Sequence, residues 1–124
     1  MTPEQAIRYM VLDILDAKTP TDLTGEVVDE LYDAVHPDDR QDILYSVREG
    51  GCETDIECER SRHYESKSVA AKAPNGLWVG WTYWYGGGKH SEPEAIGWMD
   101  GAYFLDCKEE EQLVTVRTFT KQSM

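Results

Sequence analysis

Apolar residues recur at helical spacing through the first 50 residues of the chain. In the segment 3–17 they follow the spacing i, i+3, i+4, i+7 and i+8, which places one apolar stripe along a helix. These residues are Ile7, Met10, Val11, Ile14 and Leu15. Thr2 and Gln5 form a capping-box pattern around Pro3, so we predict that the first helix begins there and runs to about residue 17.

Two further helices are predicted before residue 50. The first covers 24–35, and its apolar residues are expected to face inward: Val27, Val28, Leu31 and Val35. His36-Pro37 ends this helix, and Pro37 suits the first position of the next one. That third helix runs to about Glu49, with Ile43, Leu44 and Val47 inward, and Gly50-Gly51 terminates it.

The pattern changes from helical spacing to strands after residue 65. The segments 66–73 and 77–85 flank Pro74-Asn75-Gly76, which is typical of a turn between paired strands. Both faces of 77–85 are apolar, so we predict that this aromatic-rich strand lies in the middle of the sheet. Two more strands are predicted at 103–107 and 113–121, joined by an acidic turn at 108–112.

Two segments complete the predicted fold. Residues 52–65 alternate weakly and fit either an edge strand or an ordered loop. Ser91-Glu92-Pro93-Glu94 has the capping-box pattern, which predicts a short helix over about 92–101. The fold class is therefore α+β, with three N-terminal helices packed on a roughly four-stranded antiparallel sheet and one inserted short helix. We expect a single domain over 1–124, with a helical part (1–50) and a sheet part (51–124).

Length and composition fit a globular domain outside the membrane. The chain has 124 residues, of which 40% are hydrophobic and 29% charged. No apolar run approaches the roughly 20 residues of a membrane helix, and the N-terminus lacks the basic and apolar regions of a signal peptide. We therefore expect a cytoplasmic protein whose three cysteines are reduced.

Negative charge is concentrated in the first half of the chain. Residues 1–60 hold 16 acidic and 5 basic residues, whereas residues 61–124 hold 8 acidic and 7 basic ones. The two halves thus carry −11 and −1 of the net charge of −12. This distribution argues against direct binding of nucleic acid, which requires a basic surface, and is compatible with a basic protein partner.

The acidic residues fall on the polar positions of the predicted helices. A charge run of this kind is commonly only a solvated surface, but here few bases accompany it. Carboxylates spaced along helices can also imitate a phosphate backbone and occupy a basic groove. The residues predicted to contact a partner are Asp29, Glu30, Asp33, Asp38, Asp39 and Asp42.

A second hypothesis places a small-molecule or nucleotide site at the end of the aromatic strand. Successive glycine amides followed by a helix N-terminus can bind an anion, and Trp and Tyr rings can stack on a base. The turn is not a Walker A loop, because Tyr83 and His90 stand where that motif requires Gly and Ser or Thr. The candidate residues are Trp81, Tyr83, Tyr85, Gly87, Gly88, Lys89 and His90.

Other chemistry has no support in the sequence. The spacing of Cys52, Cys58 and His63 matches no common zinc pattern, and no catalytic triad is recognisable around any cysteine. We therefore expect no metal, no cofactor and no catalytic residues. Between an enzyme and a binding protein, the sequence favours a binding protein.

Two segments, WVGWTYWYGGGKHSEPEAI and VTVRTFTK, stand out within residues 64–121. Through them, this part of the chain resembles small acidic proteins of unassigned function carried by phages and prophages. The resemblance implies a small accessory protein that acts by binding a host protein. It transfers no active site, because no motif of known chemistry is involved. The oligomeric state is not predicted by any of these patterns.

Overall fold

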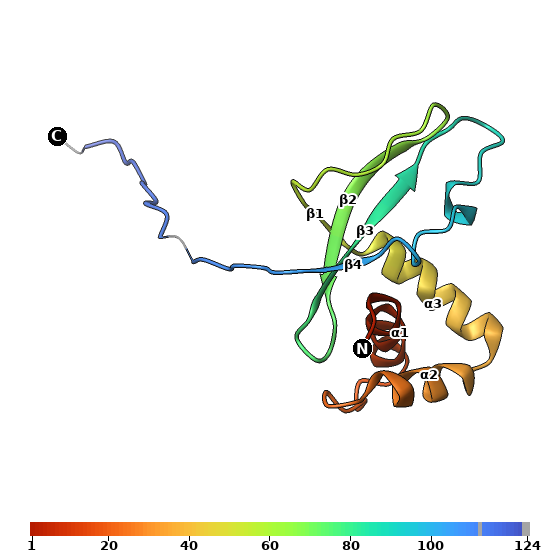
Figure 1. Ribbon diagram of the computed structural model, residues 1–124. Coiled ribbons are helices and arrows are strands. Elements are labelled where there is room, and N and C mark those ends of the chain that lie inside the picture. Colours follow the sequence, from red (N-terminus) through yellow and green to blue (C-terminus); the bar gives the residue numbers. More distant parts are fainter. Residues whose placement is uncertain (112, 123–124) are drawn as a thin grey trace.

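The computed structural model describes residues 1–111 and 113–122. Three helices come first in the chain and an antiparallel sheet of four strands follows, which confirms the predicted α+β class. The helices lie together beside the sheet (Figure 1). They are α1 (Pro3–Leu15), α2 (Gly25–Asp33) and α3 (Pro37–Glu49). The strands are β1 (Cys52–Glu53), β2 (Glu65–Lys72), β3 (Trp78–Tyr85) and β4 (Tyr103–Leu105), with one 3₁₀ turn, η1 (Pro93–Ala95).

The helices begin where the sequence predicts. The Thr2 hydroxyl accepts a hydrogen bond from the backbone N–H of Gln5, and the Gln5 side chain accepts one from the backbone N–H of Thr2. This reciprocal capping box satisfies two N–H groups that a helix start otherwise leaves unpaired. At α3, Pro37 takes the first position and the His36 ring accepts from the N–H of Asp38.

The aromatic strand β3 lies inside the sheet, as predicted from its two apolar faces. The strand order is β1-β2-β3-β4, and β3 pairs with β2 along its whole length. Trp81 is fully buried, and its indole N–H donates to the Arg48 carbonyl at 3.2 Å. The main core joins α1 and α3 to this strand through Ala6, Ile7, Met10, Val11, Val47, Val69, Ala73, Val79, Trp81 and Trp98.

The inward face of α2 is narrower than predicted. Val28 is fully buried against Tyr9 and Leu12 of α1, and Val35 packs partly against the same cluster. Val27 and Leu31 were predicted to face inward, but their side chains are 37% and 43% exposed. The reason is that, among the described residues, α2 packs mainly against α1, which covers only one stripe of its surface.

Between β3 and β4 the chain forms less regular structure than predicted. The helix expected over 92–101 is reduced to η1, and Ile96 already has extended backbone angles. The Ser91 hydroxyl donates toward the carbonyls of Gly86 and Gly88 and does not cap a helix. Glycines at 97 and 101 further disfavour helix in this segment.

The predicted strand over 113–121 is wrong. Residues 113–122 form neither helix nor strand, and they extend away from the rest of the molecule beyond β4 (Figure 1). The turn predicted over 108–112 ends at a residue outside the described part of the chain. The fourth strand is instead β1, within the segment that fitted either an edge strand or a loop. Strand 103–107 is confirmed only over Tyr103–Leu105.

Candidate functional site

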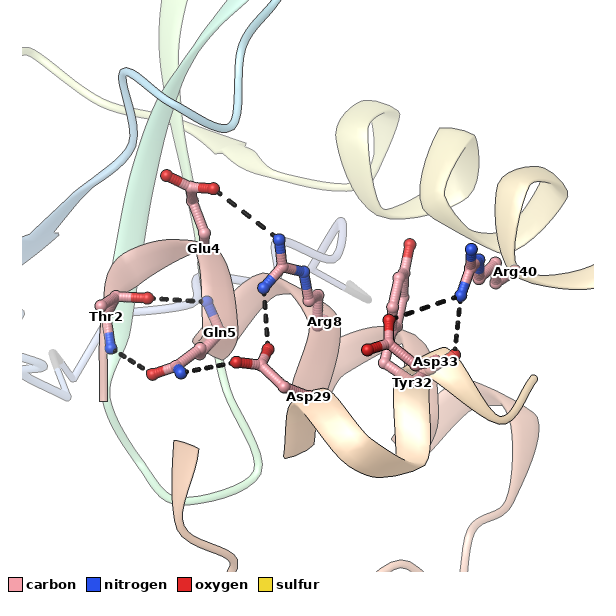
Figure 2. Close-up of polar contacts among 8 residues, drawn as sticks. All are labelled: Thr2, Glu4, Gln5, Arg8, Asp29, Tyr32, Asp33 and Arg40. Carbon is pink, nitrogen blue, oxygen red and sulfur yellow. Dashed lines mark hydrogen bonds and ion pairs between the residues drawn. The ribbon is translucent and has the colours of Figure 1, made fainter. Parts of the chain in front are cut away.

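Polar contacts attach the inner side of α2 to α1 (Figure 2). Asp29 accepts hydrogen bonds from Gln5 Nε2 at 2.8 Å and from Arg8 Nη1 at 2.7 Å. Arg8 also reaches Glu4, with 3.8 Å between Nη2 and Oε2. The same Gln5 side chain completes the capping box of α1, so one residue links the start of α1 to the middle of α2.

The sequence pattern placed Asp29 among the acids free to contact a partner. In the structure its carboxylate is instead bound to Gln5 and Arg8 of α1. The hydrogen bond from Gln5 holds the pKa of the Asp29 carboxyl below its ordinary value, and Arg8 adds to this, while burial opposes it. Gly25 leaves room for the Gln5 side chain. A Cβ atom at this position would lie 2.2 Å from Gln5 Oε1.

Tyr32 lies between two arginines at the junction of the helices. The guanidinium carbon of Arg40 is 5.0 Å from the centre of the Tyr32 ring, and that of Arg8 is 5.7 Å from it. Arg40 Nη1 also donates to the Tyr32 carbonyl at 3.1 Å. Burial raises the pKa of the Tyr32 hydroxyl. These contacts hold α2 and the start of α3 together.

A third arginine of the helical part points into the interior. Arg48 is only 3% exposed, and its Nη2 donates to the Trp84 carbonyl of β3. Its guanidinium carbon lies 4.6 Å from the centre of the Tyr83 ring. Arg8, Arg40 and Arg48 are thus all engaged in intramolecular contacts, which leaves the acidic residues of α2 and α3 with few cations beside them.

The remaining predicted partner residues lie at the surface. All five are exposed: Glu30, Asp33, Asp38, Asp39 and Asp42. Asp33 Oδ1 is 3.8 Å from Arg40 Nη1 and Asp38 Oδ2 is 3.8 Å from His36 Nδ1, and both aspartates are more than three quarters exposed. Among the described residues, Glu30, Asp39 and Asp42 form no salt bridge. We call these five acids, with Val27 and Leu31, the outer acidic face.

The structure does not bring together the seven residues of the alternative ligand site. Trp81 fills the core, so it cannot stack on a ligand. Tyr83 is packed under Arg48, and its ring stacks on that of Tyr85 with 5.8 Å between centres. Tyr85 lines a hollow of about 710 Å³ beside the 54–64 loop, whereas Gly87, Gly88, Lys89 and His90 lie outside it and are exposed.

The triple glycine has a conformation that does not suit an anion nest. Gly86, Gly87 and Gly88 have φ values of 73°, 90° and 92°. An amide nest alternates between right- and left-handed backbone, whereas these three φ values share one sign. The helix N-terminus expected to support the nest is absent, because η1 has only three residues and no side-chain cap.

In the part of the chain that the structure describes, no group of three His, Cys, Asp or Glu side chains is placed to hold a metal ion. Cys52, Cys58 and Cys107 are free thiols. Within residues 1–111 and 113–122, no helix is both long and apolar enough to cross a membrane.

Sequence reasoning missed one set of residues that the fold places together. Glu57, Glu59, Trp98, Asp100 and Tyr103 border a second hollow beside β3. They come from three separate segments, two of them loops, so no periodic pattern links them. Comparison of the chain with protein families, with curated proteins and with solved structures found no match.

Proposed function

We propose that this protein is a non-enzymatic binding protein that presents its outer acidic face to a basic protein partner. The observation that carries the proposal is the placement of the charges on the helical part. Arg48 is buried, and Arg8 and Arg40 bind Asp29 and the Tyr32 carbonyl, whereas the acids of the outer acidic face are exposed. Of these acids, only Asp33 has an arginine, Arg40, within 4 Å among the described residues. The exposed surface of α2 and α3 is therefore predominantly acidic, and it would attract a basic surface.

An apolar component accompanies the acids on α2. Val27 and Leu31 lie four residues apart, on one side of the helix, and Glu30 is exposed beside them. Protein interfaces combine an apolar centre with a polar rim, and Val27 and Leu31 would supply such a centre. The partner surface we propose is therefore basic at its edges and apolar at its centre.

The resemblance to phage and prophage accessory proteins supports a host protein as this partner. If that host protein normally binds nucleic acid, the carboxylates would occupy the positions of the phosphates. This protein would then inhibit nucleic-acid binding by the host protein. The proposal places the encounter in the cytoplasm, where three free thiols would stay reduced.

Capture experiments with variants of equal net charge test the proposal. Glu30→Lys, Asp33→Lys and Asp42→Lys together change the net charge from −12 to −6, because each reversal adds two. Glu92→Lys, Glu94→Lys and Glu109→Lys make the same change elsewhere, at exposed residues. Asp29 is left unchanged because it binds α1, and Asp38 and Asp39 because they favour the start of α3.

The wild type and the control variant should retain a common partner from host lysate at low salt. The outer-face variant should lose that partner already at low salt, and high salt should remove it from the wild type and the control variant, because screening shortens the range of the attraction. Retention of the same partners by all three proteins at both salt concentrations would mean that the acidic face is only a solvated surface.

A further inference from the structure

The second hollow, which we call the acidic groove, lies beside the second half of β3. It has a volume of about 580 Å³ and is bordered by the 57–59 loop and the segment that leads into β4. Trp84 and Trp98 also line it, and both are largely buried. The charged side chains that border it are Glu57, Glu59 and Asp100, and among the described residues no Lys, Arg or His joins them.

The polar groups of the acidic groove lack partners within the described residues. Glu57, Glu59 and Asp100 form no salt bridge there. The Tyr103 hydroxyl is buried and has no hydrogen-bond partner, although a buried hydroxyl normally has one. Gly80 of β3 is the pairing partner of Tyr103 in β4 and makes room for its ring, since a Cβ atom at Gly80 would lie 2.7 Å from Tyr103 Cε2. A hollow lined by tryptophans and carboxylates is suited to a cationic side chain that has an apolar stem.

The C-terminal segment 113–122, which we call the tail, has the complementary properties. It contains Arg117 and Lys121 and no acidic residue, in a chain whose net charge is −12. Its apolar side chains are uncovered, with Val116 83% and Phe119 85% exposed. Apolar residues in this number, alternating with polar ones, are typical of a segment that packs on another surface.

We propose that the acidic groove of one copy of this protein binds the tail of a second copy. The tail follows β4 and extends away from the rest of its own chain (Figure 1), so it lies outside its own groove in this structure. Arg117 or Lys121 places its cation beside the three carboxylates, and its stem lies in the groove that Trp84 and Trp98 line. Two tails and two grooves make a closed symmetric dimer.

This proposal concerns a different surface from the outer acidic face, so either can fail without the other. Sedimentation equilibrium of the full chain over a range of concentrations and at low salt tests it. Two variants remove the contact from opposite sides. Arg117→Gln with Lys121→Gln alters the tail, and Glu57→Gln, Glu59→Gln and Asp100→Asn alter the groove. All five side chains are exposed, so folding should be retained, and circular dichroism checks this.

The matched control for the groove variant is Asp13→Asn, Asp22→Asn and Glu92→Gln, which removes the same charge from exposed positions outside the groove. The wild type and the control should dimerise, while the tail and groove variants should dimerise roughly tenfold or more weakly, since each loses charge-assisted hydrogen bonds. A wild type that is monomeric at every concentration, or a groove variant that dimerises like the control, would overturn the proposal. A monomer whose tail resists proteolysis would place the tail in its own groove and would equally contradict a second copy.

Discussion

The two sides of α2 carry the same kinds of residue and have opposite roles. On the inner side, Val28 is buried and Asp29 is bound to Gln5 and Arg8. On the outer side, Val27 is exposed and Glu30 has no salt bridge among the described residues. Neighbouring residues of one helix are thus divided between holding the fold and facing solvent. An acidic count along the sequence does not distinguish these two groups, whereas the position of α1 does.

The largest expected difference between the two sides is in the valines. Val28→Ala should lower the free energy of unfolding by about 2 kcal/mol, because it removes two buried methyl groups and leaves a small cavity. Val27→Ala should change it by no more than about 0.5 kcal/mol, because that side chain remains partly in solvent. Urea unfolding of both variants provides the measurement. Equal losses would show that Val27 is also covered, and that α2 has no free apolar side.

The acidic pair should show a smaller difference in the same direction. Asp29→Ala should cost about 1 kcal/mol of stability, because it removes the acceptor of two hydrogen bonds at a site that is partly open to solvent. Glu30→Ala should leave the free energy of unfolding unchanged within about 0.5 kcal/mol. Thermal and urea unfolding at neutral pH test both. A Glu30 variant as unstable as the Asp29 variant would remove Glu30 from the set of acids available to a partner.

The effect of pH separates these acids further, and the expected effect is smaller still. Since the pKa of Asp29 is lower in the folded state than in the unfolded state, its ionised form favours folding. This contribution is complete above the unfolded pKa of about 4 and is lost as the pH falls through the folded value. The stability difference between the wild type and Asp29→Asn should therefore shrink as the pH is lowered from 7 toward 3. A difference that stays constant would mean that the carboxylate charge is unimportant in this contact.

The fold was largely predictable where a segment's own pattern decides its environment. β3 has apolar residues on both faces and could only lie inside a sheet, and the capping box at Thr2 and Gln5 fixed the start of α1. The pattern of Val27, Val28 and Leu31 was correctly helical, yet it could not show how much of that stripe a neighbouring helix would cover.

The tail shows where a sequence pattern fails to predict structure. Val114, Val116 and Phe119 alternate with polar residues as in a strand, but alternation does not specify a pairing partner, and this structure provides none within the described residues. The acidic groove was invisible to sequence reasoning for a related reason. Its residues come together only through the pairing of β4 with β3 and the path of the loops, which are long-range features.

The most direct test of the outer acidic face is the salt dependence of association with the partner that the wild type captures. The rate constant should be measured for the wild type and for the two variants of net charge −6 described above. We expect the association rate constant of the wild type to fall roughly tenfold or more when salt is raised from a low concentration to a physiological or higher one. The control variant should keep most of this salt dependence. The variant with Glu30, Asp33 and Asp42 reversed should associate slowly at every salt concentration. If the two variants associate at the same rate, the position of the charges is unimportant, and the outer acidic face is not the interaction surface.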